Sequence, residues 1–172
     1  MGPWTQLLDR GVRLQLLQVM GRAEEVLAEV DTMRREMAAL PDAGDREERV
    51  DPWHVRELIV QTGALAAQDL ERWELALELN EEVARGTAAR GGGDLELAWV
   101  RFNDYPSLLS LGRVDEARQL LLACRQVYEA EGYVAGLGMV FGALADLEYR
   151  LGHVDDAIGF QQTALRYIYV AM

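Results

Sequence analysis

The sequence contains no lysine, because all 17 of its basic residues are arginine. A phosphate-binding loop, a protein-kinase strand and a Schiff-base enzyme each need a lysine amine. These three kinds of site are therefore excluded. Cysteine is almost as scarce: Cys124 is the only one, so no disulfide can form within the chain. That scarcity is typical of a cytoplasmic protein, and we expect a cytoplasmic location.

Long apolar runs and a basic surface are also missing. No run approaches the roughly 18 residues that a membrane-spanning helix needs, and from the pattern of the first residues we expect no secretory leader. The net charge is −12, and acids outnumber arginines in both halves. Without a basic stripe a protein cannot neutralise a phosphate backbone. We therefore expect neither a membrane nor a nucleic acid as partner.

Residues that could support catalysis or bind a metal are few and dispersed. His54 and His153 lie far apart, and neither belongs to a zinc-binding spacing. Each is interpreted as a surface residue, and Cys124 as a buried packing thiol. We expect no cofactor, no metal and no enzymatic activity.

What the sequence does contain is a repeat. Four segments, which start at Met20, Leu70, Leu111 and Leu151, share a hydrophobe, a short turn and a helix that opens on a small apolar residue. The spacings between these apolar residues are 50, 41 and 40, measured between Val26, Ala76, Ala117 and Ala157. A nearly constant period of this length indicates stacked helical repeats.

Helical patterns flank every turn, and runs with strict alternation are absent, which predicts an all-α fold. The sequence predicts one domain over 1–172, with repeat units at about 4–40, 53–90, 94–132 and 134–169. The polar stretch from Pro41 to Pro52 is interpreted as a loop that lengthens the first interval. Eight helices are expected, at 4–20, 22–40, 53–69, 72–90, 94–111, 114–132, 134–151 and 154–169.

Two stretches, "LGRVDEARQLLLACRQVYEAEG" and "LADLEYRLGHVDDAIGFQQTALRYI", resemble tetratricopeptide repeats. Each has the Leu-Gly turn and the acid-Ala pair, followed by a small residue seven positions later. The paired positions are Ala117 with Cys124 and Ala157 with Ala164, while Ala76 with Val83 is a weaker match and Val26 with Met33 departs from the pattern.

The resemblance implies a right-handed superhelical solenoid without intrinsic catalysis. In this family the first helix of each pair lines a concave groove that holds a peptide or helix of a partner protein. The period of about 40 is similar to a long form of the repeat found in bacterial regulatory and signalling proteins. We therefore expect a protein-interaction scaffold. The alternative is a domain that senses a ligand or peptide and switches a neighbouring effector domain.

The segment "RFNDYP" interrupts the helical pattern before the third turn. A regular helix would bury Arg101 and Asp104, and Pro106 would break it. Three interpretations remain open. The helix kinks, so that Phe102 and Tyr105 pack and the two charges reach solvent; it breaks, with Asn103 or Asp104 capping a new helix; or Arg101 and Asp104 pair in the groove and contact a partner.

Polar and aromatic residues on the expected groove helices are the candidate partner contacts. They are Arg101, Phe102, Asn103, Asp146, Tyr149 and Arg150. The last helix is apolar to its end, although terminal repeats usually carry a polar outer face. We therefore expect the chain to be a fragment of a longer array or to form a homodimer. In either case the contact surface for the further repeat or the second copy is formed by Tyr167, Ile168, Tyr169 and Val170.

Overall fold

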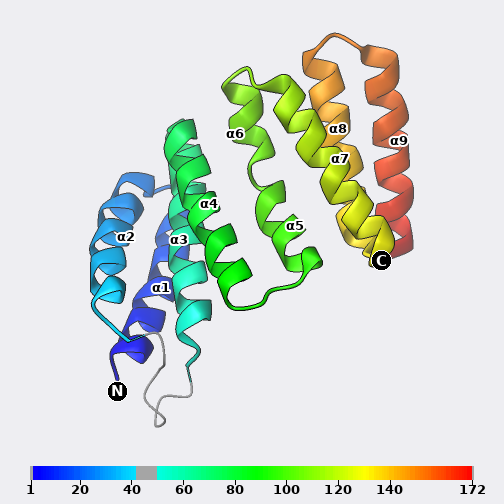
Figure 1. Ribbon diagram of the computed structural model, residues 1–172. Helices are drawn as coiled ribbons and strands as arrows, with labels where there is room; N and C mark the ends of the chain where they lie inside the picture. Colours follow the sequence, from blue (N-terminus) through cyan, green and yellow to red (C-terminus); the bar gives the residue numbers. More distant parts are fainter. Residues whose placement is uncertain (1, 42–49, 172) are drawn as a thin grey trace. The chain divides into compact units, whose positions relative to one another are not determined.

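A computed structural model describes residues 2–41 and 50–171, and within these ranges every regular element is an α-helix (Figure 1). The prediction of an all-α fold is confirmed. The chain divides into two compact units, Met1–Gly91 and Gly92–Met172. Most of the loop predicted from Pro41 to Pro52 lies outside the described residues.

The first unit holds α1 (Pro3–Val19), α2 (Ala23–Ala38), α3 (Pro52–Asp69) and α4 (Trp73–Ala89). The start of α3 follows from its sequence. The carboxylate of Asp51 accepts a hydrogen bond from the Trp53 amide at 3.0 Å, and Pro52 takes a first-turn position that needs no amide donor. These four helices lie close to the predicted ranges.

The two turns of the first unit have the same backbone shape but different residues. Gly21, between α1 and α2, has a φ of 74°, in the left-handed region that glycine enters without steric cost. Glu71 takes the equivalent place between α3 and α4, with a φ of 56°. It is the one non-glycine residue with positive φ in the described part of the chain, so this turn is locally strained.

The core of the first unit forms where α3 packs against α1, α2 and α4. Two glycines let these helices approach closely. A Cβ atom placed on Gly11 of α1 would lie 3.2 Å from the side chains of Leu58 and Ile59. A Cβ atom placed on Gly63 of α3 would lie 2.9 Å from Cγ1 of Val30. A side chain at Gly63 would force a shift of α2 or α3, whereas one at Gly11 would require the Leu58 and Ile59 side chains to move by a few tenths of an ångström.

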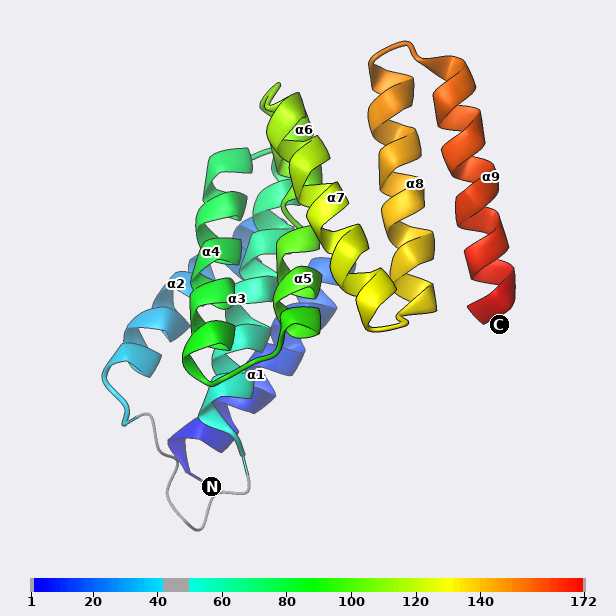
Figure 2. The ribbon, with the colours of Figure 1, turned by 45° about the vertical axis from the view of Figure 1, so that its right-hand side comes forward.

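The second unit holds α5 (Asp94–Phe102), α6 (Tyr105–Ser110), α7 (Val114–Ala130), α8 (Val134–Arg150) and α9 (Val154–Ala171). α7 packs against α5, α6 and α8, and α8 pairs with α9 (Figure 2). The ring of Tyr128 is fully buried and meets Tyr133 edge to face at 5.3 Å between centroids. This aromatic pair joins α7 to the start of α8.

The prediction of one helix over 94–111 is wrong, because the chain breaks between α5 and α6. Pro106 falls in the first turn of α6, where its missing amide has no helical partner to lose. Asp104 occupies the N-cap position, although its side chain makes no capping hydrogen bond within the described residues. The structure therefore shows the break that was one of the three interpretations.

The break does not bring Asp104 to solvent, contrary to the kink interpretation. Asp104 is 7% exposed. Its charge acts on Arg113, which directly precedes α7, and on Cys124 of α7. The pKa of Arg113 is raised, mainly by Glu116 and in part by Asp104. Phe102 and Tyr105 do pack, with ring centroids 5.2 Å apart. None of the helices described is long and apolar enough to cross a membrane.

Candidate functional site

The candidate contacts on α8 lie in its last turns. Asp146 and Arg150 form an ion pair at 3.0 Å, one helical turn apart. Asp146 is partly buried, whereas Arg150 and Tyr149 are exposed, and the Tyr149 side chain is 67% accessible. An exposed arginine and an exposed tyrosine on one helix end can contact a partner through charge and through aromatic surface.

The candidates around the break differ in their exposure. Arg101 and Asn103 are partly buried, and both take part in polar interactions. Phe102 is buried, at 7% accessibility, so its ring serves the core of the second unit and offers little surface to a partner. The structure therefore leaves Arg101 and Asn103 as candidate contacts and places Phe102 in the packing.

Sequence reasoning did not include Tyr105 among the contacts, but the structure brings it to the α8 candidates. Burial raises the pKa of the Tyr105 phenol, the negative charge of Asp146 raises it further, and Arg150 lowers it. The charges at the end of α8 therefore act on the phenol of α6. The signal in the sequence was the tyrosine itself, which stands where the neighbouring unit has the small residue Ala145.

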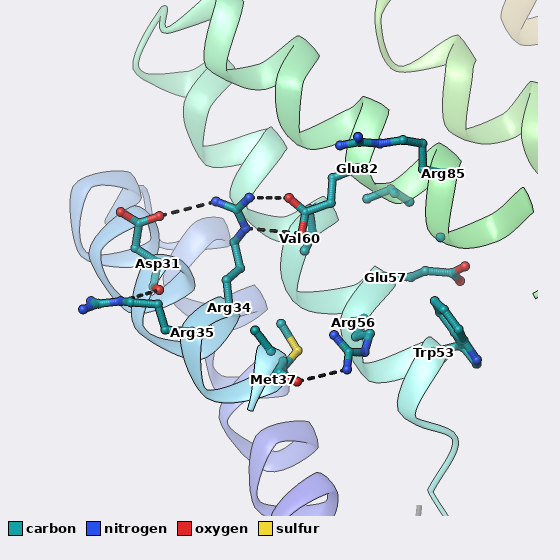
Figure 3. A pocket seen from close by; sticks show the side chains of 13 residues that line it. Asp31, Arg34, Arg35, Met37, Trp53, Arg56, Glu57, Val60, Glu82 and Arg85 are labelled. Atoms are coloured by element: carbon teal, nitrogen blue, oxygen red, sulfur yellow. Dashed lines mark hydrogen bonds and ion pairs between the residues drawn. The ribbon is translucent and has the colours of Figure 1, made fainter. Parts of the chain in front are cut away.

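A separate pocket of about 590 Å³ lies in the first unit, between α2, α3 and α4 (Figure 3). Its apolar wall is made of Met37, Trp53, Val60 and Val83. This volume falls in the range of small-molecule sites, roughly 300–1,000 Å³. Sequence reasoning missed the pocket because it is assembled from two helical hairpins whose packing no local pattern reveals.

The polar lining of this pocket is rich in arginine. Arg34 reaches from α2 to Glu82 of α4 and also pairs with Asp31 at 3.6 Å (Figure 3). Arg56 donates to the Met37 carbonyl at 3.0 Å and lies over the Trp4 ring at 4.9 Å. These two guanidiniums are therefore fixed in place by protein contacts.

Two further arginines line the same pocket and are exposed. Among the described residues, Arg35 binds its own helix, through the Asp31 carbonyl at 3.2 Å and the Thr32 hydroxyl. Arg85 makes no ion pair among the residues that the structure describes. Both guanidiniums can therefore bind an anionic group that enters the pocket.

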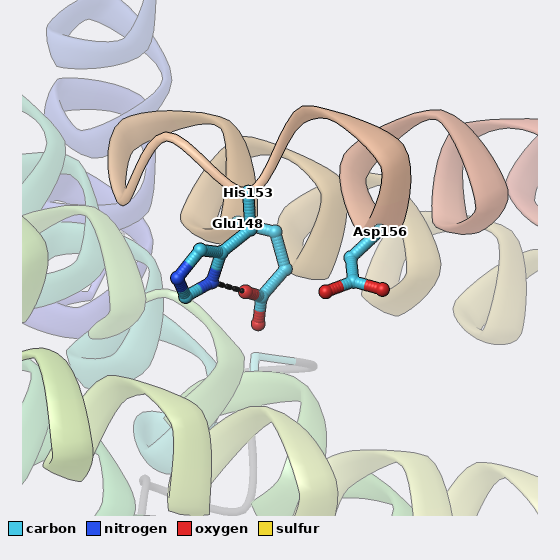
Figure 4. Close-up of side chains that lie close together, drawn as sticks. All are labelled: Glu148, His153 and Asp156. Carbon is cyan, nitrogen blue, oxygen red and sulfur yellow. Dashed lines mark hydrogen bonds and ion pairs between the residues drawn. The ribbon is translucent and has the colours of Figure 1, made fainter.

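Glu148, His153 and Asp156 gather where α8 turns into α9 (Figure 4). The Glu148 side chain is only 4% exposed, and its carboxylate accepts a hydrogen bond from Arg118 of α7. Nδ1 of His153 lies 2.7 Å from the same carboxylate. Arg118 lowers the pKa of Glu148 most strongly, and His153 adds to the effect. His153 is exposed, as the sequence predicts for a turn residue.

These three side chains are types that bind divalent cations. The Arg118 guanidinium already balances the charge of Glu148, however, so the arrangement is explained as an ion pair that fastens α8 to α7. Sequence reasoning missed the cluster because its members were considered separately.

The predicted C-terminal surface is largely accessible. Tyr169 and Val170 are strongly exposed and Ile168 is exposed as well, whereas Tyr167 is partly buried and stacks on Phe141 with 5.5 Å between ring centroids. Tyr167 therefore belongs to the α8–α9 contact, and the other three residues form an open apolar surface.

No protein-family model matches this sequence, and neither a curated protein nor a solved structure matches it.

Proposed function

We propose that the chain is a tetratricopeptide-like solenoid that acts as a protein-interaction scaffold, within a bacterial regulatory or signalling protein. In this proposal its helical hairpins stack into a right-handed superhelix, and the first helix of each pair lines a groove for a peptide or helix of the partner. Support comes from the repeated hairpins, whose turns share a left-handed residue and whose aligned residues Val26, Ala76, Ala117 and Ala157 are all buried.

The observation that carries the proposal is the exposed end of α8, where Arg150 pairs with Asp146 at 3.0 Å and both charges act on Tyr105 of α6. Tyr105, Asp146 and Arg150 come from the first helices of two successive repeats and influence one another electrostatically. Arg101 and Asn103 lie just before Tyr105. Such a surface combines hydrogen-bond donors with one aromatic ring, which suits a peptide that carries a carboxylate.

A peptide-library screen against the 172-residue chain tests this function. Peptides that bind are measured again with Arg101→Glu and Arg150→Glu, each of which we expect to weaken binding about tenfold or more. Arg166→Glu is the matched control, because Arg166 is exposed on α9 and has no ion pair among the described residues. Affinities that all three variants leave unchanged would remove the groove assignment.

A second candidate function is ligand sensing, which the pocket between α2, α3 and α4 favours. A small amphipathic anion could place its apolar part against Trp53 and its charge beside Arg35 and Arg85. Because the lining comes from two hairpins, such a ligand would bias their packing and so signal to an attached domain. A thermal-shift screen with aromatic carboxylates tests it: Arg85→Glu should abolish the stabilisation and Arg166→Glu should not.

A further inference from the structure

The first helix of the chain exposes two apolar residues at places where α3 and α8 are buried. Val12 and Leu16 of α1 are 47% and 62% exposed. Equivalent positions are found by counting from the aligned residues Val26, Ala76, Ala117 and Ala157. All of the equivalents on α3 and α8 are buried: Thr62 and Ala66 on α3, and Ala143 and Leu147 on α8.

The junction between the first two hairpins shows what covers this face of a first helix. On α3 this face packs against α1 and α2. Thr62 and Ala66 lie on the same face, and residues around them make four contacts with the first hairpin. Gln18 donates to Asp69 at 3.0 Å, and Arg72 pairs with Glu24 at 2.7 Å. The other two contacts are the close approaches at the two glycines, of Ile59 to Gly11 and of Gly63 to Val30.

The α8–α9 hairpin carries the same receiving face, and there it is open. Gly142 is equivalent to Gly11, and a Cβ atom placed on it would meet no atom within 4 Å in the described structure. Tyr149, Asp155 and Gln161 are equivalent to Gln18, Glu24 and Val30, and all three are exposed. A helical glycine costs about 1 kcal/mol relative to alanine, and the packing around Gly142 gives no reason for one.

We propose that α1 of a second copy of this chain docks on the α8–α9 face, head to tail. If the contacts between the first two hairpins are repeated between α8–α9 of one copy and α1 of the next, residues of matching chemistry come together. Asp155 meets Arg22 of the second copy, as Glu24 meets Arg72. Tyr149 meets Val19 of the second copy, an apolar pair in place of the polar pair of Gln18 and Asp69.

Two further pairs of contacting residues inside the chain are also replaced by matching residues at its two ends. Arg118 and Glu148 form an ion pair at the junction of α7 with α8, and their equivalents at the two ends are Ile158 and Leu17. Val30 and Gly63 are in contact inside the first unit, and their equivalents are Gln161 and Arg13, both exposed. In these four transferred pairs both ends are apolar, both polar or oppositely charged, whereas the contact of Ile59 with Gly11 transfers to Asp9 and Gly142. Matched pairs of this kind are the complementarity that a docking partner requires.

This contact joins two different surfaces, so copies would add one after another into an open chain or a closed ring. The proposed contact between copies rests on the repeat register and not on the proposed groove, so an experiment can contradict one proposal without the other. Tyr149, a groove candidate in the sequence, is assigned here to the contact between copies.

Light scattering of the chain over a range of concentration tests the contact. We expect the mean mass to rise with concentration and to exceed that of a dimer. Gly142→Leu should weaken association at least about tenfold and leave the fold intact, because the site is open and leucine favours a helix over glycine. Gly159→Leu is the control: it is the same change at an exposed helical glycine equivalent to the exposed Gln119.

Mixing two blocked variants gives the sharper result. Gly142→Leu disables the receiving face, and Leu16→Asp disables the inserting face. Each variant alone should be monomeric, but their mixture should form a one-to-one dimer, since each retains one working end. Circular dichroism checks that both remain folded.

Three results would overturn the proposal. One is a monomer at every concentration, which is also expected if other residues or another protein cover the face. Another is undiminished association of Gly142→Leu. The third is self-association of Leu16→Asp as strong as that of the unaltered chain, which would indicate a symmetric contact through α9.

Discussion

The carboxylate of Glu148 accepts a hydrogen bond from the guanidinium of Arg118, and this ion pair fastens α8 to α7. The Glu148 side chain is buried, while about a third of Arg118 is exposed. Removing Arg118 leaves a buried charge with His153 as its remaining partner. We expect Arg118→Ala to lower the free energy of unfolding by about 1–3 kcal/mol, below the value for a fully buried pair because solvent screens Arg118.

Urea unfolding followed by circular dichroism measures this change. The control is Glu129→Ala, which removes the exposed pair of Glu129 with Arg125 on the same helix α7. Exposed pairs of this kind contribute about 0.3–0.5 kcal/mol. Equal losses for the two variants would show that burial of Glu148 adds nothing to the pair.

The same pair gives stability a dependence on pH. The pKa of Glu148 is lowered in the folded protein, chiefly by Arg118, so the folded state holds this proton less tightly than the unfolded state. Its contribution is therefore complete above the ordinary pKa of 4.5 and is lost as the pH falls through the lower folded value. The difference in unfolding free energy between the unaltered chain and Glu148→Gln should be constant near pH 7 and shrink below about pH 4.5. A difference that grew with acid would contradict this.

Gly63 is required by the close approach of α3 to α2. Gly63→Ala would place its methyl group 2.9 Å from Cγ1 of Val30, so the helices must shift. We expect a loss of about 1–3 kcal/mol from this overpacking. Gly159→Ala has open space among the described residues and should gain about 0.5–1 kcal/mol from helix propensity alone. Thermal unfolding of both variants measures the contrast, and a stabilising Gly63→Ala would refute it.

Glu71 occupies a left-handed turn position where three equivalent turns have glycine. A side chain in this conformation costs about 1–2 kcal/mol, which the greater freedom of unfolded glycine offsets in part. Glu71→Gly should therefore raise the unfolding free energy by about 0.5–1 kcal/mol. Glu74→Gly, three residues later in the first turn of α4, should lower it. Chemical denaturation checks both signs, and a destabilising Glu71→Gly would mean that the Glu71 side chain makes a compensating contact.

Cys124 should be chemically inert while the protein is folded. Its thiol is buried, donates to the Ala98 carbonyl at 3.4 Å, and has its pKa raised to about 11, mainly by burial and also by Asp104. A thiol reagent at pH 8 should therefore modify Cys124 only after denaturant is added. Fast labelling of the native protein would show that α5 and α7 separate readily.

The sequence by itself determined the all-α class and most of the helices and turns, with the exception of the helix predicted over 94–111. The small residues Ala76, Ala117 and Ala157 mark one buried position in three units, because a helix must place its apolar stripe against a neighbour and the stripe is a local pattern. The same local information indicated that Cys124 would be buried. It also showed that Pro106 disturbs a helix, but not whether the helix would kink or break.

The tertiary structure alone decided which side chains meet. It buried Asp104 and Phe102, brought Tyr105 under the electrostatic influence of Asp146, and built a pocket from α2, α3 and α4. It also showed that side chains of α3 occupy the space beside Gly11, while the space beside Gly142 is open in the described structure. Each of these outcomes depends on contacts between residues distant in sequence. Such contacts follow from how whole helices pack, and a pattern of period 3.6 along one helix does not specify them.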